Sequence, residues 1–168
     1  MKKVFIFLFL SVLFASCKSA STATTVSKSE TKKESKKENR TLVKNLIETA
    51  VDNIGIKYKA GGTNRRSGFD CSGLVYTTFE SENIKLPRSS YEQAKIGKVI
   101  PLNDAKKGDL IFFKTNKSRQ INHVGLITEV NSDEIKFVHS STSKGVIISS
   151  TKEPYYKNSF EQVNRIIE

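Results

Sequence analysis

The fold is decided by the stretch His123-Val-Gly-Leu-Ile-Thr-Glu-Val-Asn-Ser-Asp-Glu-Ile-Lys-Phe-Val-His139. Two segments rich in Val, Ile and Phe flank Asn131-Ser132-Asp133, which is a turn sequence. The stretch therefore predicts two antiparallel strands joined by a tight turn. It also contains both histidines of the chain.

The register of this predicted hairpin determines where the two histidines lie. If Val130 pairs with Glu134, His139 lies opposite Gly125, and His123 points to the same face two residues away. The two histidines are then diagonal neighbours, roughly 7–8 Å apart at Cα. Ile127, Ile135 and Phe137 join the same face, where a helix could cover them.

Outward from this hairpin, helices precede strands along the chain. Helical spacing of apolar residues starts after Thr41 and ends at Gly55, and further helices are expected from Cys71 and from Ser89 to Gln93. Additional strands are expected at residues 109–113, 145–149 and 163–167. This order predicts an α+β fold in which N-terminal helices pack on an antiparallel sheet of about five strands.

Cys71 is the candidate nucleophile of the domain. We expect it at a helix N-terminus, capped by Asp70 or Ser72, where the helix dipole favours the thiolate. The residues alone suggest Cys71 as nucleophile, His123 as general base and acid, and His139 as the residue that orients His123. Two alternatives stay open on spacing alone: a buried core cysteine with incidental histidines, and a zinc site, which would have only three protein ligands.

Several motifs resemble the NlpC family of papain-like cell-wall cysteine peptidases, and above all its Spr-type lipoprotein murein endopeptidases. The three that carry the site are Asp70-Cys71-Ser72-Gly73, His123-Val124-Gly125-Leu126 and Phe137-Val138-His139-Ser140. Others are Tyr58-Lys59-Ala60-Gly61-Gly62, Leu86-Pro87-Arg88-Ser89-Ser90, Lys107-Gly108-Asp109-Leu110 and the stretch from His139 to Ser149.

The resemblance implies a papain-like domain over residues 41–168 that hydrolyses stem-peptide bonds of peptidoglycan without a metal or another cofactor. It implies the same catalytic roles for Cys71, His123 and His139. Tyr58 is expected beside the nucleophile, near the oxyanion site. Asp70 and Ser72 are expected to line the substrate groove, and we expect a monomer.

The first residues have the pattern of a bacterial lipoprotein leader. A basic start and the apolar run from Val4 to Phe14 predict a signal peptide over residues 1–16, too short to span a bilayer. Ala15-Ser16-Cys17 resembles a lipobox, which implies lipidation of Cys17; an ordinary secretory signal with a spare thiol is the alternative. Residues 17–40, rich in Ser, Thr, Lys and Glu, predict a lipid-anchored flexible tether. Lys18 is compatible with anchoring at the periplasmic face of the outer membrane, in the cell envelope.

The charge of the chain bears on which binding partners are expected. The 168-residue chain has a formal charge of +11, and a basic protein associates with polyanions such as nucleic acid, cell wall or lipid headgroups. No basic run with interleaved aromatic residues and no zinc-finger spacing occurs, so no nucleic-acid partner is expected.

Three functions remain in competition at this stage. The first is an endopeptidase that cuts the D-Ala–diaminopimelate cross-links, and the second cuts between D-Glu and diaminopimelate within one stem. The third, from another class, is a lipid-anchored wall-binding module with an inactive site. A cysteine–histidine ion pair in an active enzyme would make activity rise as the thiolate forms and fall as the imidazolium loses its proton.

Overall fold

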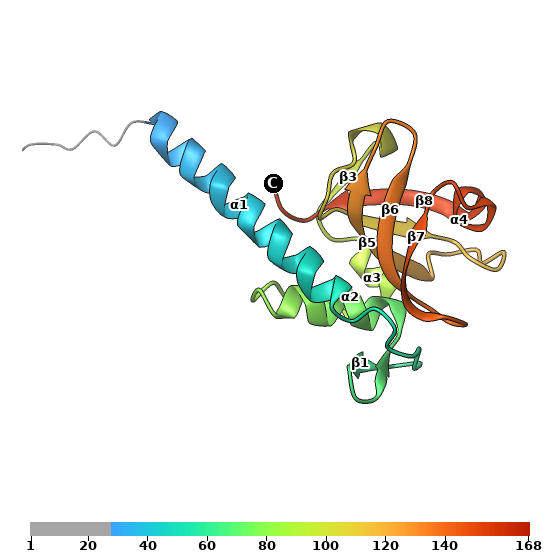
Figure 1. Cartoon of the computed structure of the whole chain (residues 1–168). Coiled ribbons are helices and arrows are strands. Elements are labelled where there is room, and N and C mark those ends of the chain that lie inside the picture. The colour runs from blue at the N-terminus through green and yellow to red at the C-terminus, as the bar shows by residue number, and fades with distance from the viewer. Residues whose placement is uncertain (1–27) are drawn as a thin grey trace, which may run out of the picture.

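The computed structural model describes residues 28–168 as an α+β domain (Figure 1). Its helices are α1 (Lys28–Val51), α2 (Cys71–Glu80), α3 (Ser90–Gln93) and α4 (Pro154–Ser159), with the 3₁₀ helix η1 (Leu102–Asp104). The predicted fold class is confirmed. The predicted signal peptide at 1–16, Cys17 and the tether up to residue 27 lie outside the described residues.

A six-stranded antiparallel sheet forms the body of the domain, in the order β3-β8-β4-β5-β6-β7. Its strands are β3 (Lys98–Ile100), β4 (Leu110–Phe113), β5 (His123–Val130), β6 (Ile135–Ser141), β7 (Gly145–Ser150) and β8 (Phe160–Arg165). The strand missing from the predicted set is β3, which is only three residues long. Only Ile100 of β3 is buried, so the segment has no alternating pattern to detect. A separate hairpin, β1 (Thr63–Asn64) and β2 (Gly68–Phe69), precedes α2.

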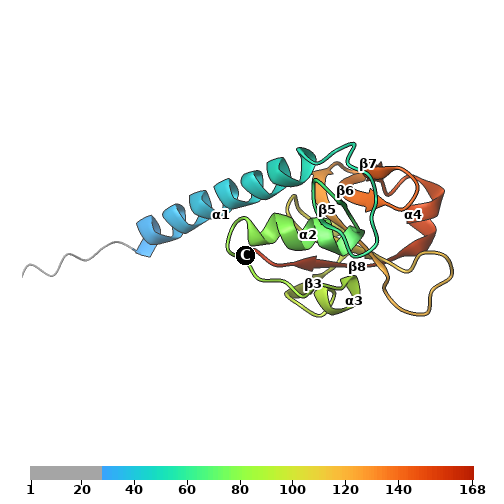
Figure 2. The same ribbon diagram turned by 90° about the horizontal axis from the view of Figure 1, so that it is seen from below.

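Two apolar clusters cover the two faces of the sheet. Leu46 of α1 and Leu74 and Phe79 of α2 pack with Phe112 and Leu126, and Figure 2 shows α1 and α2 together on this side. The cluster on the opposite face contains Ile127, Ile135 and Phe137, which the hairpin pattern places on the same face as the histidines. Tyr156 of α4 packs with them. That face is therefore covered by the short helix α4, which the sequence pattern does not indicate.

The predicted start of the first helix near Thr41 is wrong, because α1 begins at Lys28. The composition of residues 28–40, part of the predicted tether, gives a helix no apolar stripe to bury. Most of their described side chains are exposed, and Figure 1 shows this part of α1 extending away from the sheet. Lys and Glu have high helix propensity, and extending an existing helix avoids the cost of nucleation. In the part of the chain that the structure describes, no helix combines the length and apolarity needed to cross a bilayer.

The hairpin that carries the histidines contains a bulge. Val130 pairs with Ile135 rather than with Glu134, so the predicted pairing next to the turn is wrong by one residue. The register shifts between Ile127 and Glu129, and beyond the shift Leu126 pairs with Val138. This is the register expected at the far end of the hairpin, so the bulge at Thr128 leaves His123 and His139 on the same face.

Candidate active site

Cys71 is the first residue of α2, as the sequence predicts. Asp70 is the N-cap, and its Oδ1 accepts a hydrogen bond from the backbone N–H of Gly73 at 2.7 Å. The Cys71 side chain is a free thiol with 9% relative exposure. Its Sγ lies 3.8 Å from the carbonyl oxygen of Asn122, the residue before His123. The helix start thus places the thiol against the beginning of β5.

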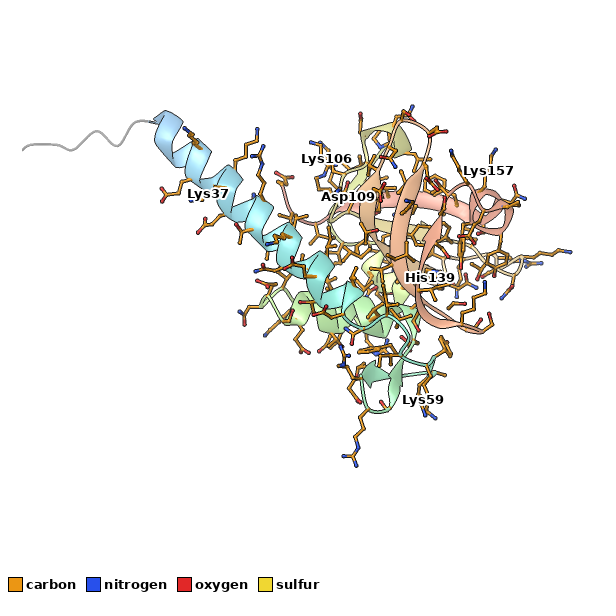
Figure 3. All side chains as sticks on the ribbon, in the orientation of Figure 1. Lys37, Lys59, Lys106, Asp109, His139 and Lys157 are labelled. Carbon is orange, nitrogen blue, oxygen red and sulfur yellow. The ribbon has the colours of Figure 1, made fainter. Side chains whose placement is uncertain are left out.

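The two histidines contact each other through their rings. His123 Nε2 lies 2.9 Å from His139 Nδ1, and His139 Nε2 lies 3.2 Å from the hydroxyl of Tyr156. Figure 3 shows His139 among the side chains of the sheet. Since Nε2 of His123 is occupied by His139, Nδ1 is the nitrogen of His123 that is free to exchange a proton with a thiol. Tyr156 is a member of this chain of contacts that the sequence analysis missed.

The strand that carries His139 is also tied to the segment that carries Cys71. Ser140, buried on β6, donates a hydrogen bond from its hydroxyl to the carbonyl of Phe69 at 2.8 Å. Because Phe69 is two residues before Cys71 and Ser140 directly follows His139, this bond holds the Cys71 segment against the strand that carries His139. Ser140 belongs to the motif Phe137-Val138-His139-Ser140, but the motif alone does not predict this hydrogen bond.

Burial sets the charge of the central residues. Burial, followed by the nearby charge of Asp70, raises the pKa of the Cys71 thiol to about 11, although backbone N–H donors of Val124 and Ser72 act to lower it. Burial also lowers the pKa of His123 to about 4. Burial and the neighbouring His123 lower the pKa of His139 to about 3. These shifts favour a neutral Cys71 thiol and neutral imidazoles, whereas the position of Cys71 at a helix N-terminus alone predicts a thiolate.

An arginine that sequence reasoning did not single out anchors the other side of the nucleophile. Arg88 forms two hydrogen bonds with the Asp70 carboxylate, at 2.6 and 2.9 Å, and donates to the hydroxyl of Ser72 at 3.0 Å. Burial alone would raise the pKa of Asp70, but Arg88 and the N–H groups of Gly73 and Gly61 hold it below its usual range. Arg88 stands in the Pro-Arg-Ser segment, so its position in the motif was the available signal.

Tyr58 lies near the same group of side chains. Its backbone forms an isolated bridge with Phe69. Burial raises the pKa of its phenol, and the nearby Asp70 carboxylate raises it further. The structure thus brings Tyr58, Asp70 and Ser72 together around Cys71, with the two histidines on the sheet side. Within residues 28–168, no cluster of three or more His, Cys, Asp or Glu side chains could hold a metal ion.

A cysteine at the start of a helix, packed against an antiparallel sheet that carries a histidine and its polar partner, defines a papain-like domain. The model of the NlpC/P60 family matches residues 55–165, and the chain belongs to this family.

Sequence relatives with known names cover most of the chain. It is 34% identical to the Escherichia coli (strain K12) protein named murein DD-endopeptidase MepS/murein LD-carboxypeptidase, over 94% of this chain and 88% of that protein. A probable endopeptidase of Haemophilus influenzae is 47% identical over 67% of each chain.

A solved NlpC/P60 family protein from Bacillus cereus has the same fold, with a TM-score of 0.66 and 29% identity. The superposition covers 75% of this chain. This chain spans 40% of that longer protein.

Proposed function

We propose that this protein is a peptidoglycan hydrolase: a cysteine endopeptidase that cuts murein stem-peptide bonds, above all D-Ala–diaminopimelate cross-links. The observation that carries the proposal is the contact between His123 and His139 next to a free thiol at the start of α2. The murein endopeptidase relative supports the substrate class.

The proposed reaction follows from the positions of these groups. The Cys71 thiol passes its proton to Nδ1 of His123 as Sγ attacks the scissile carbonyl carbon, and a tetrahedral intermediate forms. Backbone N–H groups at the α2 N-terminus, with the Tyr58 hydroxyl, stabilise its oxyanion. His123 then protonates the leaving amine, the C–N bond breaks, and a thioester remains on Cys71. Water, deprotonated by His123, hydrolyses the thioester and releases the new carboxylate.

His139 and the polar residues around Asp70 have supporting roles in this proposal. His139 accepts a hydrogen bond from Nε2–H of His123, which leaves Nδ1 as the basic nitrogen. Asp70 and Ser72, held by Arg88, bind the part of the stem peptide that stays on the enzyme as the thioester.

The location of the enzyme is also part of the proposal. Lipidation of Cys17 would hold the domain at a membrane of the cell envelope, and the sequence around Cys17 supports the periplasmic face of the outer membrane. The substrate is then the cell wall nearby. We expect the domain to act as a monomer, with a complete catalytic site in each chain.

A second activity is favoured by a specific observation. The Escherichia coli relative is also named a murein LD-carboxypeptidase, so removal of a terminal D-Ala from a stem peptide is the second candidate. Cleavage between D-Glu and diaminopimelate, and wall binding by an inactive module, are competing functions that give different products or none.

Digestion of purified cross-linked peptidoglycan tests the proposal, with Cys71→Ala as the matched control and products identified by mass. We expect cross-linked dimers to disappear as monomers accumulate, with no products from the control. Dipeptide-bearing products would instead indicate cleavage after D-Glu. Tight wall binding without products from folded protein would refute the enzyme.

A further inference from the structure

A polar pocket of about 390 Å³ lies on the side of His123 that faces the β6–β7 turn. It is lined by His123 together with Lys144, Glu153, Tyr155 and several hydroxyl side chains of the turn. Cys71, Asp70, Tyr58 and Arg88 do not line it. The site therefore has two sides, one around Cys71 and Asp70 and the other beyond His123.

The chemistry of the proposed reaction assigns the pocket to the leaving fragment. His123 donates the proton to the leaving amine, so the released amino acid must lie within reach of the His123 ring. The fragment that stays as the thioester is bound on the other side, among the residues around Asp70. The polar pocket is lined by His123 but by none of the residues around Asp70. It is therefore placed to hold the amino acid whose nitrogen is released.

Lys144 gives the pocket a free positive charge. It is exposed in the turn between β6 and β7, and it forms no ion pair with any residue from 28 to 168. The other charged side chain beside it, Glu153, accepts a hydrogen bond from the backbone N–H of Ser150 at 2.8 Å. Glu153 keeps its negative charge, so the pocket holds one anion and one cation, and Lys144 is the cation available to a ligand carboxylate, next to the hydroxyls of Ser141 and Ser143.

The turn that carries Lys144 is held firmly by the rest of the domain. Gly145, the next residue, has φ +71°, and a Cβ there would lie 2.3 Å from the carbonyl oxygen of Ile56. Val146 donates to that same carbonyl at 2.8 Å and accepts from the N–H of Gly55 at 2.9 Å. These contacts fix the backbone at Gly145 and Val146, directly after Lys144.

We propose that Lys144 binds the free carboxylate of the leaving amino acid. This proposal rests on the proposed function, and it explains which peptide bond the enzyme would prefer. In a D-Ala–diaminopimelate cross-link, the carbon next to the leaving nitrogen carries a free carboxylate. A terminal D-Ala carries one at the same position. The D-Glu–diaminopimelate bond of a tetrapeptide stem has an amide there, so one cation would favour the first two bonds over the third.

The test compares two cross-linked muropeptide dimers that differ at one group. In one dimer the carboxylate next to the scissile nitrogen is free, and in the other it is amidated. We expect the full chain, purified in detergent, to cut the free form with a kcat/KM about tenfold higher, as for one charge-assisted hydrogen bond. Lys144→Gln should remove this preference mainly through KM, because the contact exists before and during the reaction.

Two further variants control the result. Lys144→Arg should keep the preference, and Lys157→Gln, on the exposed side of α4 and outside the pocket, should match the unmodified protein (Figure 3). Equal cleavage of both dimers by the unmodified protein, or an equal loss on both in Lys144→Gln, would overturn the role of Lys144 alone. Cleavage of neither dimer would overturn the proposed function itself.

Discussion

Cys71 and His123 share one transferable proton in the active form of the site, and their surroundings determine where it rests. The helix N-terminus favours the thiolate, but the thiol is almost fully buried and Asp70 lies nearby. Among residues 28–168, no carboxylate contacts the ring of His123, and its contact is a second buried imidazole. The proton therefore rests on sulfur until a substrate changes the surroundings.

This charge state predicts the pH dependence of kcat/KM. The acidic limb should follow protonation of His123, whose pKa is about 4, because a protonated imidazole cannot accept the thiol proton. The alkaline limb should follow ionisation of Cys71, with a pKa of about 11. We therefore expect nearly constant kcat/KM on a soluble muropeptide from roughly pH 5 to 9.

A thiolate–imidazolium pair would give a different profile, with activity falling above about pH 8 as the imidazolium loses its proton. Alkylation of Cys71 by iodoacetamide separates the two cases in a chain that starts after Cys17, because Cys71 is then its single thiol. The neutral thiol should react slowly at pH 7 and faster as the pH rises toward 11. Fast, pH-independent alkylation near pH 6 would contradict the neutral pair.

Sequence reasoning reached some residues of this site better than others. Cys71, His123 and His139 could be identified because each belongs to a local pattern, a helix start or a hairpin. Arg88 belongs to a recognisable motif, but its contacts, like those of Tyr156, arise only when the segments around α3 and α4 pack against α2 and β6. Side chains placed by tertiary packing leave no periodic signal in the sequence.

At the level of elements, the β5–β6 hairpin places both histidines on the predicted face although the predicted pairing next to its turn is wrong. The turn pairs Val130 with Ile135, one residue away from the predicted partner. Alternation of apolar residues constrains which face is buried, but it does not locate an inserted residue. The bulge at Thr128 compensates for the turn, so the burial of Ile127 and Phe137 determines the final register.

The N-terminus of α2 depends on a close approach between two backbones. A Cβ on Gly73 would lie 2.0 Å from the carbonyl oxygen of Gly62 and 3.1 Å from Nη2 of Arg88. In an open helix, Gly→Ala stabilises by about 1 kcal/mol. Here we expect Gly73→Ala to destabilise the domain by about 1–3 kcal/mol, as for overpacking, measured by urea denaturation.

Activity should fall further than stability in this variant, because α2 must shift away from Gly62 and carries Cys71 with it. A displacement of about 1 Å at a reacting group costs on the order of 100-fold in rate. Glu80→Ala, at the exposed end of the same helix, should change stability by less than about 0.5 kcal/mol. If the Gly73→Ala variant were more stable and fully active, the loop at Gly62 would have moved away from the new Cβ without cost, contrary to this prediction.

At the scale of the whole molecule, α1 belongs to two environments. Its C-terminal half contributes Leu46 and Ala50 to the core, each almost fully buried. Its N-terminal half projects from the domain (Figure 1), and a groove of about 970 Å³ lies between this helix and the residues around Lys106 and Arg165. The outer turns of α1 therefore add little to the core.

This division predicts the result of shortening the chain. A chain that starts at residue 41 loses exposed side chains and the hydrogen bond from Asn39 to the Glu168 carbonyl, so its free energy of unfolding should change by less than about 1 kcal/mol. Leu46→Ala in that chain should cost about 2–5 kcal/mol. Unfolding of the 41–168 chain, measured by urea denaturation, would show that the outer turns of α1 are needed for the fold. In a chain that keeps residues 1–27 and lacks only 28–40, full activity on soluble muropeptides with reduced cell-wall cleavage from the membrane would show that residues 28–40 let the domain reach the wall.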